Sequence, residues 1–517
     1  MKKLLQLGII IIGINAYSQA GSLDTGFGTG GKVVTSINSG ADKAYGVALQ
    51  SDGKIVVAGY SYSSIYGNDF ACARYNTNGS LDITFGNNGI KTYDLQVGSD
   101  DKAYSVDIQL DGKIVLAGYS DNGSDKAGAV IRLNTDGTLD TSFSSDGKVF
   151  TNFTYLGTLP RADEFKVVKV HQLTGNIVVG GTSYDGPESK GIFARYNSTG
   201  ALDTTFGNGG ILIDLPYPES NSNGFTFVIE DLKLKSNGKI TAVGWSDVPG
   251  SGSLAYSRQY VCRLNSNGTL DTTFSSDGYA SNSFTTSDNK TYSLILKPDD
   301  SLLFSGSSYY SATDYQSYFG SVSSSGTVSV QGSISFAANT IDMCYGMGLD
   351  STGKIIIAGS VINSTANTSN FSLARINSNY TIDTTFGSSG IVMTSFGANT
   401  FSESYDMAIQ SDDKIILVGY SGNDFAIARY NGNTLSNNEF GLNKQITLYP
   451  NPVKNKLNID LQYNQSSSDA FKICDINGRV ILGGNLTNGL NQINVENLSN
   501  GLYIFNAENI NQKFIKE

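Results

Sequence analysis

The chain has 517 residues, of which 39% are hydrophobic and 11% aromatic, and its formal net charge is −11. This length exceeds one ordinary domain, unless that domain is a barrel, a propeller or an array of repeats. Most of the acidic excess lies between residues 21 and 440. It disfavours nucleic acid or an anionic membrane surface as a partner, because both require a basic face.

Residues 1–20 have the composition of a signal peptide. Two lysines precede an apolar stretch, Leu4 to Ile14, which is too short to span a bilayer, and small residues follow it. We expect cleavage after Ser18 or after Ala20, with a buried N-terminal strand as the alternative. The rest of the sequence contains no transmembrane segment, so we expect a soluble mature protein.

A nine-residue phrase, LDTTFGNGG at residues 202–210, occurs in six close variants along the chain. Each copy has one aspartate at the same position: Asp24, Asp82, Asp140, Asp203, Asp271 and Asp383. The first four steps between these aspartates are 58 to 68 residues, and the last is 112 residues. The long last step indicates a seventh unit whose phrase has been lost.

Each unit contains four segments of about six to eight residues that are rich in Val, Ile, Tyr and Ala. Gly, Asp, Asn or Ser residues bound most of these segments, which is typical of β-strands. A pair such as Asp111-Gly112 between the second and third segments predicts a tight hairpin. No segment shows a sustained helical period, so we expect almost no helix.

Seven four-stranded units favour a β-propeller, because packing blades around an axis buries both apolar faces of each sheet. A right-handed β-helix is the rival fold, although it would prefer shorter coils and fewer tight hairpins. We therefore predict an all-β chain. A seven-bladed propeller of four-stranded antiparallel blades spans residues 21–432, a linker spans 433–443, and a small Ig-like β-sandwich spans 444–517.

We interpret the repeated phrase as a structural joint, because an enzyme needs one asymmetric centre instead of six copies. Its expected place is between the outermost strand of one blade and the innermost strand of the next. The aspartate is suited to cap backbone N–H groups, and the Leu and Phe to be buried between blades. An arginine in the fourth segment of six units is expected to pair with that aspartate or with carbonyl groups. The N-terminal copy would supply the joint that blade seven lacks, so we expect ring closure without a swapped strand.

The combined pattern, LDxTFG with GK-I-V-V-A-G and A-R-Y-N-x-x-G, resembles the delta-60 repeat family of bacterial propeller-like proteins over about Gly21 to Gly432. The resemblance implies an exported propeller. It implies no assigned activity, and the family has no agreed functional residues to transfer.

The C-terminal segment resembles the type A sorting domain of the type IX secretion system of Bacteroidetes-type bacteria. The matching positions are Tyr449, Pro450, Asn451 and Pro452, the DINGRV stretch with Gly478, the LSNGLY stretch with Gly501, and the terminal FIK. The resemblance implies the type IX machinery as a partner and a secreted or cell-surface location. It leaves open whether the tail is cleaved or replaced by a glycolipid anchor; a carbohydrate-binding sandwich is the alternative.

The sequence predicts no catalytic residue, no cofactor and no metal site. Its one histidine, His171, excludes a His-rich metal centre, and no serine elbow, HExxH, P-loop or dinucleotide glycine motif occurs. The stretch Asp121 to Asp125 offers oxygens for calcium but lacks a complete binding loop. The four cysteines lie in different units or domains, and we expect small buried side chains, with one disulfide as the alternative.

The loops that vary most between units are expected to share one face of the propeller. Aromatic residues near them are candidate ligand contacts: Tyr60, Tyr119, Tyr184, Trp245, Tyr309 and Tyr420. Variable loops on a rigid scaffold often bind ligands, and tyrosine-rich polar surfaces suit glycans or proteins. Packing at the rim of the blades is the alternative interpretation.

We therefore predict a monomeric, non-enzymatic propeller scaffold that binds a glycan or a protein outside the cell. A glycan-active enzyme is one alternative, since carboxylates could pair across blades. Its candidate residues are Asp163, Glu164, Glu219, Asp247 and Glu403. A structural surface-coat protein with no specific ligand is the other alternative.

Overall fold

The computed structural model describes residues 19–64, 67–153, 162–185, 188–213, 226–248, 256–282, 288–311, 314–398, 400–433, 445–462, 469–475, 480–487, 489–507 and 510–517. Two compact units are present, one within Ser18–Asn433 and one within Thr434–Glu517. The regular elements of the described ranges are all β-strands. Within these ranges there is no helix long and apolar enough to cross a membrane. Most of the predicted signal peptide and of the predicted linker lies outside these ranges.

The described strands of the first unit form seven antiparallel four-stranded blades, and each blade begins with its innermost strand and ends with its outermost one. Blade 1 contains β2 (Asp42–Leu49), β3 (Ile55–Ser63), β4 (Gly67–Tyr75) and β5 (Ile90–Tyr93). Blade 2 contains β6 (Asp100–Ile108), β7 (Ile114–Asp121), β8 (Lys126–Leu133) and β9 (Lys148–Thr151). Blade 3 contains β10 (Ala162–Val170), β11 (Ile177–Asp185), β12 (Glu188–Tyr196) and β13 (Ile211–Ile213).

The remaining blades repeat this order. Blade 4 contains β14 (Thr226–Leu234), β15 (Ile240–Val248), β16 (Tyr256–Leu264) and β17 (Tyr279–Asn282). Blade 5 contains β18 (Asn289–Leu296), β19 (Leu302–Ser311), β20 (Asp314–Val322) and β21 (Val328–Ile334). Blade 6 contains β22 (Ile341–Leu349), β23 (Ile355–Asn363), β24 (Thr368–Ile376) and β25 (Ile391–Thr394). Blade 7 contains β26 (Ser402–Ile409), β27 (Ile415–Ser421), β28 (Asp424–Tyr430) and β1 (Lys32–Thr35).

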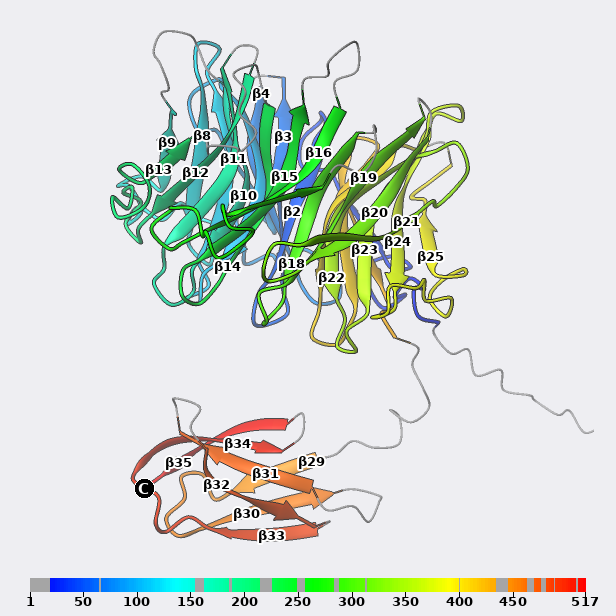
Figure 1. Cartoon of the computed structure of the whole chain (residues 1–517). Helices are drawn as coiled ribbons and strands as arrows, with labels where there is room; N and C mark the ends of the chain where they lie inside the picture. The colour runs from blue at the N-terminus through cyan, green and yellow to red at the C-terminus, as the bar shows by residue number, and fades with distance from the viewer. Residues whose placement is uncertain are drawn as a thin grey trace, which may run out of the picture. The chain divides into compact units, whose positions relative to one another are not determined.

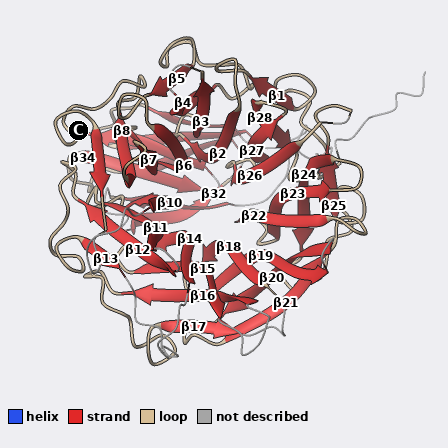
Figure 2. Ribbon diagram, turned by 90° about the horizontal axis from the view of Figure 1, so that it is seen from above, coloured by secondary structure: helices blue, strands red, loops and turns tan. Residues whose placement is uncertain are grey.

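The blades form a ring, seen from the side in Figure 1 and from above in Figure 2. The innermost strands β2, β6, β10, β14, β18, β22 and β26 surround the axis, and neighbouring ones contact each other. The second strand of a blade, such as β7, is buried along almost its whole length because another blade packs on each side. Burial on both faces explains why segments such as IVLAGY are continuous apolar runs.

The ring is closed by a strand from the N-terminus, and the expectation of closure without a swapped strand is wrong. β1 pairs with β28 along Lys32↔Ala428 to Thr35↔Phe425. The N-terminal phrase does supply the joint of blade 7, since Arg429 bonds Asp24. The first described strand of the propeller, β1, is thus the outermost strand of the last blade.

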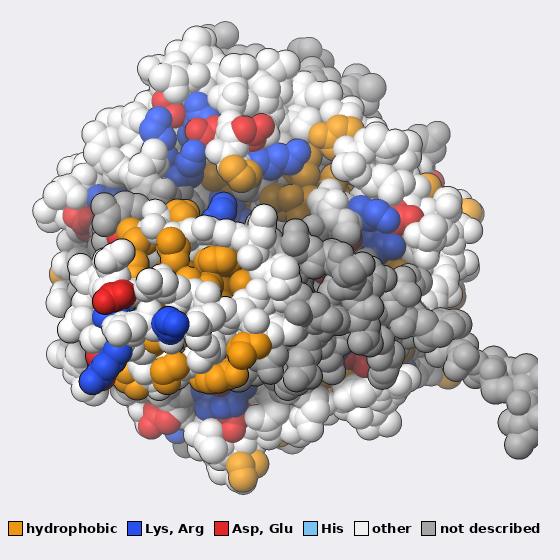
Figure 3. All heavy atoms as spheres, turned by 90° about the horizontal axis from the view of Figure 1, so that it is seen from below, with side chains coloured by type: hydrophobic (Ala, Val, Ile, Leu, Met, Phe, Trp, Pro, Cys, Tyr) orange, Lys and Arg blue, Asp and Glu red, His pale blue; other side chains and the backbone are white. Residues whose placement is uncertain are grey.

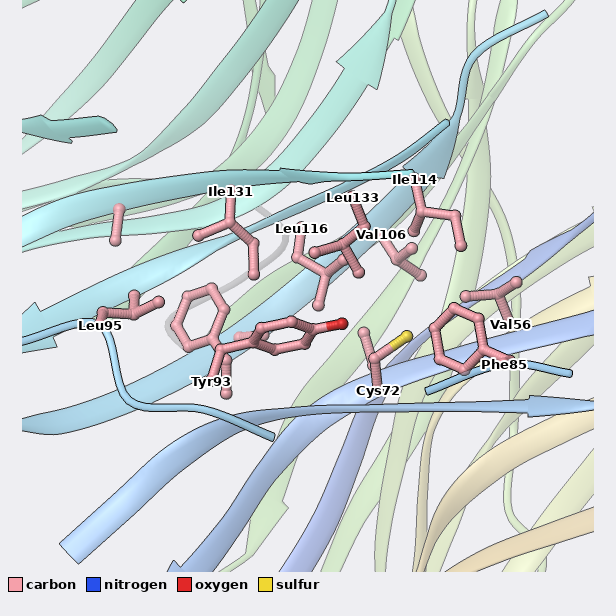
Figure 4. Close-up of a cluster of buried hydrophobic side chains, with 14 residues drawn as sticks. Val56, Cys72, Phe85, Tyr93, Leu95, Val106, Ile114, Leu116, Ile131 and Leu133 are labelled. Carbon is pink, nitrogen blue, oxygen red and sulfur yellow. The ribbon is translucent and has the colours of Figure 1, made fainter. Parts of the chain in front are cut away.

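The repeated phrase lies between the third and fourth strands of one blade, so its predicted place in the strand order is also wrong. The copy at residues 81–89 connects β4 to β5, which belong to the same sheet. Its Phe85 packs against the next blade in a shared core with Ile114 and Leu116 (Figure 4). The phrase therefore joins two blades through its side chains while connecting strands of only one.

Each of the six intact phrases carries an ion pair that is buried or partly buried. The pairs are Arg74–Asp82, Arg132–Asp140, Arg195–Asp203, Arg263–Asp271, Arg375–Asp383 and Arg429–Asp24, with N···O distances of 2.7 to 2.8 Å. In blade 2, Arg132 also donates to the carbonyl of Ser198 in blade 3 at 2.7 Å and lies over the ring of Phe143. Burial alone would raise the pKa of Asp82, but the hydrogen bonds from Thr84 and the charge of Arg74 outweigh it and lower that pKa to about 2.

The second unit is a small sandwich of two sheets. One sheet contains β29 (Gln445–Tyr449), β30 (Lys456–Gln462) and β33 (Gly489–Asn494). The other contains β32 (Val480–Leu486), β31 (Asp469–Cys474), β34 (Gly501–Ala507) and β35 (Ile510–Lys516). Apolar side chains of both sheets, such as Leu457 and Phe505, form a common core.

The predicted sorting motif begins at the end of β29. Tyr449 is the last residue of that strand, and Pro450 and Pro452 follow on the surface. Asn451 accepts the backbone N–H of Ile515 at 2.9 Å, which connects the motif to β35. Gly501 begins β34, whereas Gly478 lies outside the described residues.

The four cysteines Cys72, Cys262, Cys344 and Cys474 are all buried and free. The exposed turn at Asp121 to Asp125 is stabilised by its own side chains, because Asp121 accepts the N–H of Gly123 and Asn122 that of Ser124. Over the face of the chain seen in Figure 3, positive and negative side chains lie close to one another.

Candidate ligand site on the propeller axis

Every innermost strand carries a β-bulge at the same position. In β2 the register shifts between Ala44 and Gly46, so that Tyr45 is left without a pairing partner. The same shift occurs in the other six blades. The seven bulged residues are Tyr45, Tyr104, Lys166, Glu230, Tyr292, Tyr345 and Tyr405, and all of them line a cavity on the axis. A bulge re-aims a side chain, and here the re-aimed side chains come together.

A glycine in the second strand of each blade makes room for the bulge. The glycines are Gly59, Gly118, Gly181, Gly244, Gly306, Gly359 and Gly419. A Cβ at any of them would lie 1.8 to 2.0 Å from a backbone carbonyl oxygen of the innermost strand. This steric requirement explains the glycine of the recurring KIVVAGY-type segment.

Side chains of neighbouring blades bond the backbone near the bulges. Asp406 of blade 7 accepts the N–H of Val47 in blade 1 at 2.9 Å. Asp231 likewise accepts the N–H of Leu294 in the next blade at 3.1 Å. These bonds satisfy backbone donors at the axis and hold adjacent innermost strands together.

Five of the bulged residues form a continuous arc of tyrosines around the cavity, whose volume is about 390 Å³. Successive ring centroids are 4.5 to 5.3 Å apart in the order Tyr104, Tyr45, Tyr405, Tyr345 and Tyr292. Burial raises the pKa of each of these phenols. The hydroxyl groups are therefore neutral at physiological pH and can both donate and accept hydrogen bonds.

Blades 3 and 4 break the tyrosine arc with a lysine and a glutamate. Lys166 bonds Glu164 and lies 4.2 Å from the ring centroid of Tyr104. Burial alone would lower the pKa of Lys166, but Glu164 and Glu230 outweigh it and raise that pKa. Burial raises the pKa of Glu230, which also accepts the indole N–H of Trp245 at 3.0 Å. One side of the cavity is thus aromatic and the other is charged.

A second charged group lies further along the axis. Burial alone would lower the pKa of Lys169, but Asp107, Asp231 and Asp406 outweigh it and raise that pKa. Burial raises the pKa of Asp406 to about 6, although the N–H of Val47 and the charge of Lys169 oppose the shift. The cavity consequently offers both cationic donors and carboxylate acceptors.

Three of the six predicted aromatic contacts lie directly behind the arc. Tyr60, Tyr119 and Tyr420 are buried, and their ring centroids are 5.8 to 6.0 Å from those of Tyr45, Tyr104 and Tyr405. Tyr420 donates to Glu403 at 3.0 Å, and Tyr119 donates to Asp100 at 2.8 Å. These three tyrosines pack against residues that line the cavity.

The other three predicted contacts have different surroundings. The indole N–H of Trp245 donates to Glu230, and the ammonium of Lys290 lies 4.1 Å from the ring centroid of Trp245. Tyr184 is 38% exposed. Tyr309 packs edge-on against Tyr315, with ring centroids 5.3 Å apart, and is not part of the arc.

The residues that line the axis were missed by the sequence interpretation. Their signal is a tyrosine that follows a small or β-branched residue near the start of each unit, as in AY, CY, SY and TY. Lys166 and Glu230 replace this tyrosine in two adjacent units, which hides the pattern. The single histidine lies elsewhere, where His171 contacts Thr174 and the carbonyl of Ser236.

The carboxylates considered for catalysis are also dispersed. Asp163 accepts the backbone N–H of Phe153, and Asp247 accepts the hydroxyl of Ser257. Glu403 accepts the hydroxyls of Tyr405 and Tyr420. Glu164 contacts Lys166 at the cavity, and Glu219 lies outside the described residues.

Solved structures of other proteins resemble this chain only distantly. A catalytically inactive virginiamycin B lyase from Staphylococcus aureus is 12% identical, with a TM-score of 0.41, and the match covers 77% of this chain and 98% of the lyase. A protein of unknown function from Dyadobacter fermentans is 11% identical, with a TM-score of 0.39 and coverages of 77% and 97%. Likeness at this level carries no argument about activity or ligand. No curated protein gave a significant match.

Two family models match the sequence and confirm both resemblances. The beta-propeller domain of unknown function DUF5122 matches residues 50–85, 109–143, 172–206, 235–274, 351–386 and 410–433. The secretion system C-terminal sorting domain matches residues 447–517. The chain therefore carries repeats of the DUF5122 β-propeller family and ends in a sorting domain that directs it through type IX secretion to the cell surface or beyond it.

Proposed function

We propose that this protein is a monomeric extracellular propeller that binds the end of a glycan chain in its axial cavity. The observation that carries the proposal is the arc of five tyrosines with Lys166 and Glu230 at its gap. A sugar has an apolar C–H face and several hydroxyl groups. Aromatic faces suit the first, and phenol, ammonium and carboxylate groups suit the second.

The size of the cavity favours a small ligand. A volume of about 390 Å³ falls within the range of about 300–1,000 Å³ that is usual for small-molecule sites. Such a space accommodates about one or two sugar rings, whereas a folded protein would have to bind on the outer loops. The Tyr-rich loop face remains the candidate surface for a protein ligand.

Substitutions in the arc test the proposal. We expect the mature wild-type protein to retain a subset of sugars on a glycan array. Replacing Tyr345 or Tyr405 by alanine should weaken binding by about tenfold or more, which corresponds to about 1.4 kcal/mol for one aromatic contact. Tyr62→Ala is the matched control, because Tyr62 is 43% exposed and does not line the cavity.

Two results would contradict glycan binding in the cavity. One is an array without any bound sugar at several calcium concentrations. The other is an equal loss of affinity in Tyr62→Ala and Tyr345→Ala, which would place the ligand on the outer loops. Binding of proteins but not of sugars would support the protein-ligand alternative.

A glycan-cleaving activity is the second candidate function, supported by two carboxylates, Glu164 and Glu230, whose charges both act on Lys166. Burial raises the pKa of Glu230. For Glu164 the charges of Lys166 and Lys126 outweigh burial and lower the pKa. Pairs of carboxylates with opposite pKa shifts are typical of acid–base catalysis. Release of reducing ends from bound glycans, abolished in Glu230→Gln, would favour this function over simple binding.

A further inference from the structure

Three carboxylates come together at the junction between blades 1 and 2, away from the axial cavity. Asp69 lies in β4, Asp94 follows β5, and Asp101 lies near the start of β6. One carboxylate oxygen of each lies within 4.8 Å of the others. Tyr93 and Leu95, the chain neighbours of Asp94, belong to the apolar core shown in Figure 4.

Two of these carboxylates contain buried oxygens that have no partner. Asp69 is only 5% exposed, and its Oδ1 has no hydrogen-bond partner. The Oδ1 atom of Asp94 is likewise buried and unpartnered. A buried charge without a partner is costly unless it is neutralised or coordinates a metal.

No cationic side chain of the described residues neutralises the cluster. Within that part of the chain, none of the observed ion pairs involves Asp69, Asp94 or Asp101. The ammonium of Lys148 instead donates to the backbone carbonyls of Asp94 and Leu95 at 3.0 Å. Burial and the charges of Asp94 and Asp101 raise the pKa of Asp69 to about 6.

Asp101 is held in place by the loop between the two blades. It accepts the backbone N–H of Leu95 and the hydroxyl of Ser99, both at 2.7 Å. Its equivalents in other blades bond their loops in the same way, since Asp42 accepts the N–H of Ile37 and Asp342 that of Phe336. The loop contact is therefore a common feature. Blade 7 also has an aspartate, Asp424, at the position of Asp69, but the position of Asp94 is taken there by Ser36.

The strand register identifies the equivalent positions in another blade. Phe70 pairs with Tyr93 in blade 1 as Phe371 pairs with Thr394 in blade 6. The counterparts of the three aspartates at the junction of blades 6 and 7 are therefore Asn370, Ser395 and Ser402, none of which is charged. The same fold thus does not require three carboxylates at this place.

We propose that Asp69, Asp94 and Asp101 bind a calcium ion between blades 1 and 2. Carboxylate oxygens without nitrogen or sulfur ligands are suited to a hard divalent cation. Calcium is the occupant to expect, because extracellular modules bind it with dissociation constants of about 10⁻⁴–10⁻³ M. The ion joins the end of β5 to β6 and so fastens the loop between the two blades.

Equilibrium binding of calcium to the mature full-length protein tests this site. We expect isothermal titration calorimetry with calcium chloride to show one ion per chain, with a dissociation constant of about 10⁻⁴–10⁻³ M. Asp69→Asn and Asp94→Asn should each weaken binding at least tenfold. Asp94 is only half-buried, so Asp94→Asn should fold and can test the site even if Asp69→Asn fails to fold.

Asp121→Asn is the matched control, because Asp121 belongs to the exposed acidic turn that offers oxygens for calcium. It should leave binding unchanged. The site is refuted if the wild-type protein binds no calcium at 10 mM (about ten times the weakest expected constant), or if Asp94→Asn binds it as well as wild type. Loss of binding in Asp121→Asn alone would place the ion on the exposed turn. Glycan binding is measured separately, so failure of either proposal leaves the other intact.

Discussion

Replacing Gly118 by alanine tests whether sterics enforce the axial bulges. Gly118 lies in β7 opposite the bulge of β6, and its φ is not in the left-handed region. A Cβ at this position would lie 1.8 Å from the carbonyl oxygen of Lys102 and 2.9 Å from the Cα of Ala103. Since comfortable separations are about 3.5 Å or more, the backbone of β6 would have to move by about 1.7 Å.

The expected cost is at the upper end of the range for overpacking. Inserting a methyl group into a packed core usually costs about 1–3 kcal/mol. Here the obstacle is backbone held between two blades, so we expect a loss of about 3 kcal/mol. For a unit of roughly 400 residues, an unfolding entropy of about 2.1 cal/mol/K per residue converts this into a fall in Tm of about 3.6 °C.

Urea and thermal unfolding, followed by circular dichroism, measure this effect. The control is Gly123→Ala, in the turn between β7 and β8, where a Cβ would meet no atom within 4 Å but φ is 82°. The left-handed backbone should cost this variant only about 1–2 kcal/mol. If Gly118→Ala is no less stable than Gly123→Ala, sterics do not enforce the bulge. Reduced glycan binding by Gly118→Ala would further connect the bulge to the position of Tyr104.

Three other predictions address the joints, the pH dependence and the N-terminus. Arg132→Ala leaves Asp140 buried with only Lys113 as an ionic partner. We expect its free energy of unfolding, measured in urea, to fall by about 3 kcal/mol. A fall of less than about 1 kcal/mol would mean that the pair contributes no more than a surface ion pair. Burial raises the pKa of Asp342 to about 6. The stabilisation from its protonated form is therefore complete below about pH 4 and is lost as the pH rises through 6. The free energy of unfolding of Asp342→Asn should rise by about 2–3 kcal/mol relative to that of wild type between pH 4 and pH 7. A difference that does not vary with pH would contradict this assignment. Ala20 is 1% exposed, and its carbonyl oxygen accepts the N–H of Gly387 at 2.8 Å. Mass spectrometry of the secreted protein should therefore find a first residue at or before position 19. A mature chain that starts at Gly21 would contradict a structural role for Ala20.

The local chemistry of the repeats was readable from the sequence. Segment composition, the DG hairpin turns and the recurring phrase predicted four strands per unit and seven units, and the described strands form seven blades of four strands each. The tail motifs predicted the sorting domain, which the family model matches. These features are local, because each depends on a few adjacent residues.

The phase of the repeat could not be read in the same way. A periodic sequence shows the spacing of its units but not where one unit begins, since every cyclic shift has the same pattern. A phrase between two blades would make the segment after it an innermost strand, whereas β5, which follows the copy at residues 81–89, is the outermost strand of blade 1. Both errors, the position of the phrase and the mode of ring closure, follow from this single shift.

The axial site depended on geometry that strand alternation conceals. A bulge adds one residue to the innermost strand and turns it towards the axis, and the alternating pattern offers no sign of that turn. The sequence interpretation therefore selected Tyr60 and Tyr420, which follow the most regular segment, and overlooked Tyr45 and Tyr405. In the structure the first pair lies behind the second.

By itself, the sequence determined the strands, the repeat, the glycine in each second strand and the export signal of the tail, because these are encoded by neighbouring residues. The tertiary structure alone decided which side chains meet. Tyr45 and Tyr405 are far apart in the chain, and their ring centroids are 4.5 Å apart only because blade 7 closes against blade 1. Asp69 and Asp101 come together because blade 1 packs against blade 2. Contacts of this kind result from ring closure and blade packing, and they cannot be predicted from patterns of neighbouring residues in the sequence.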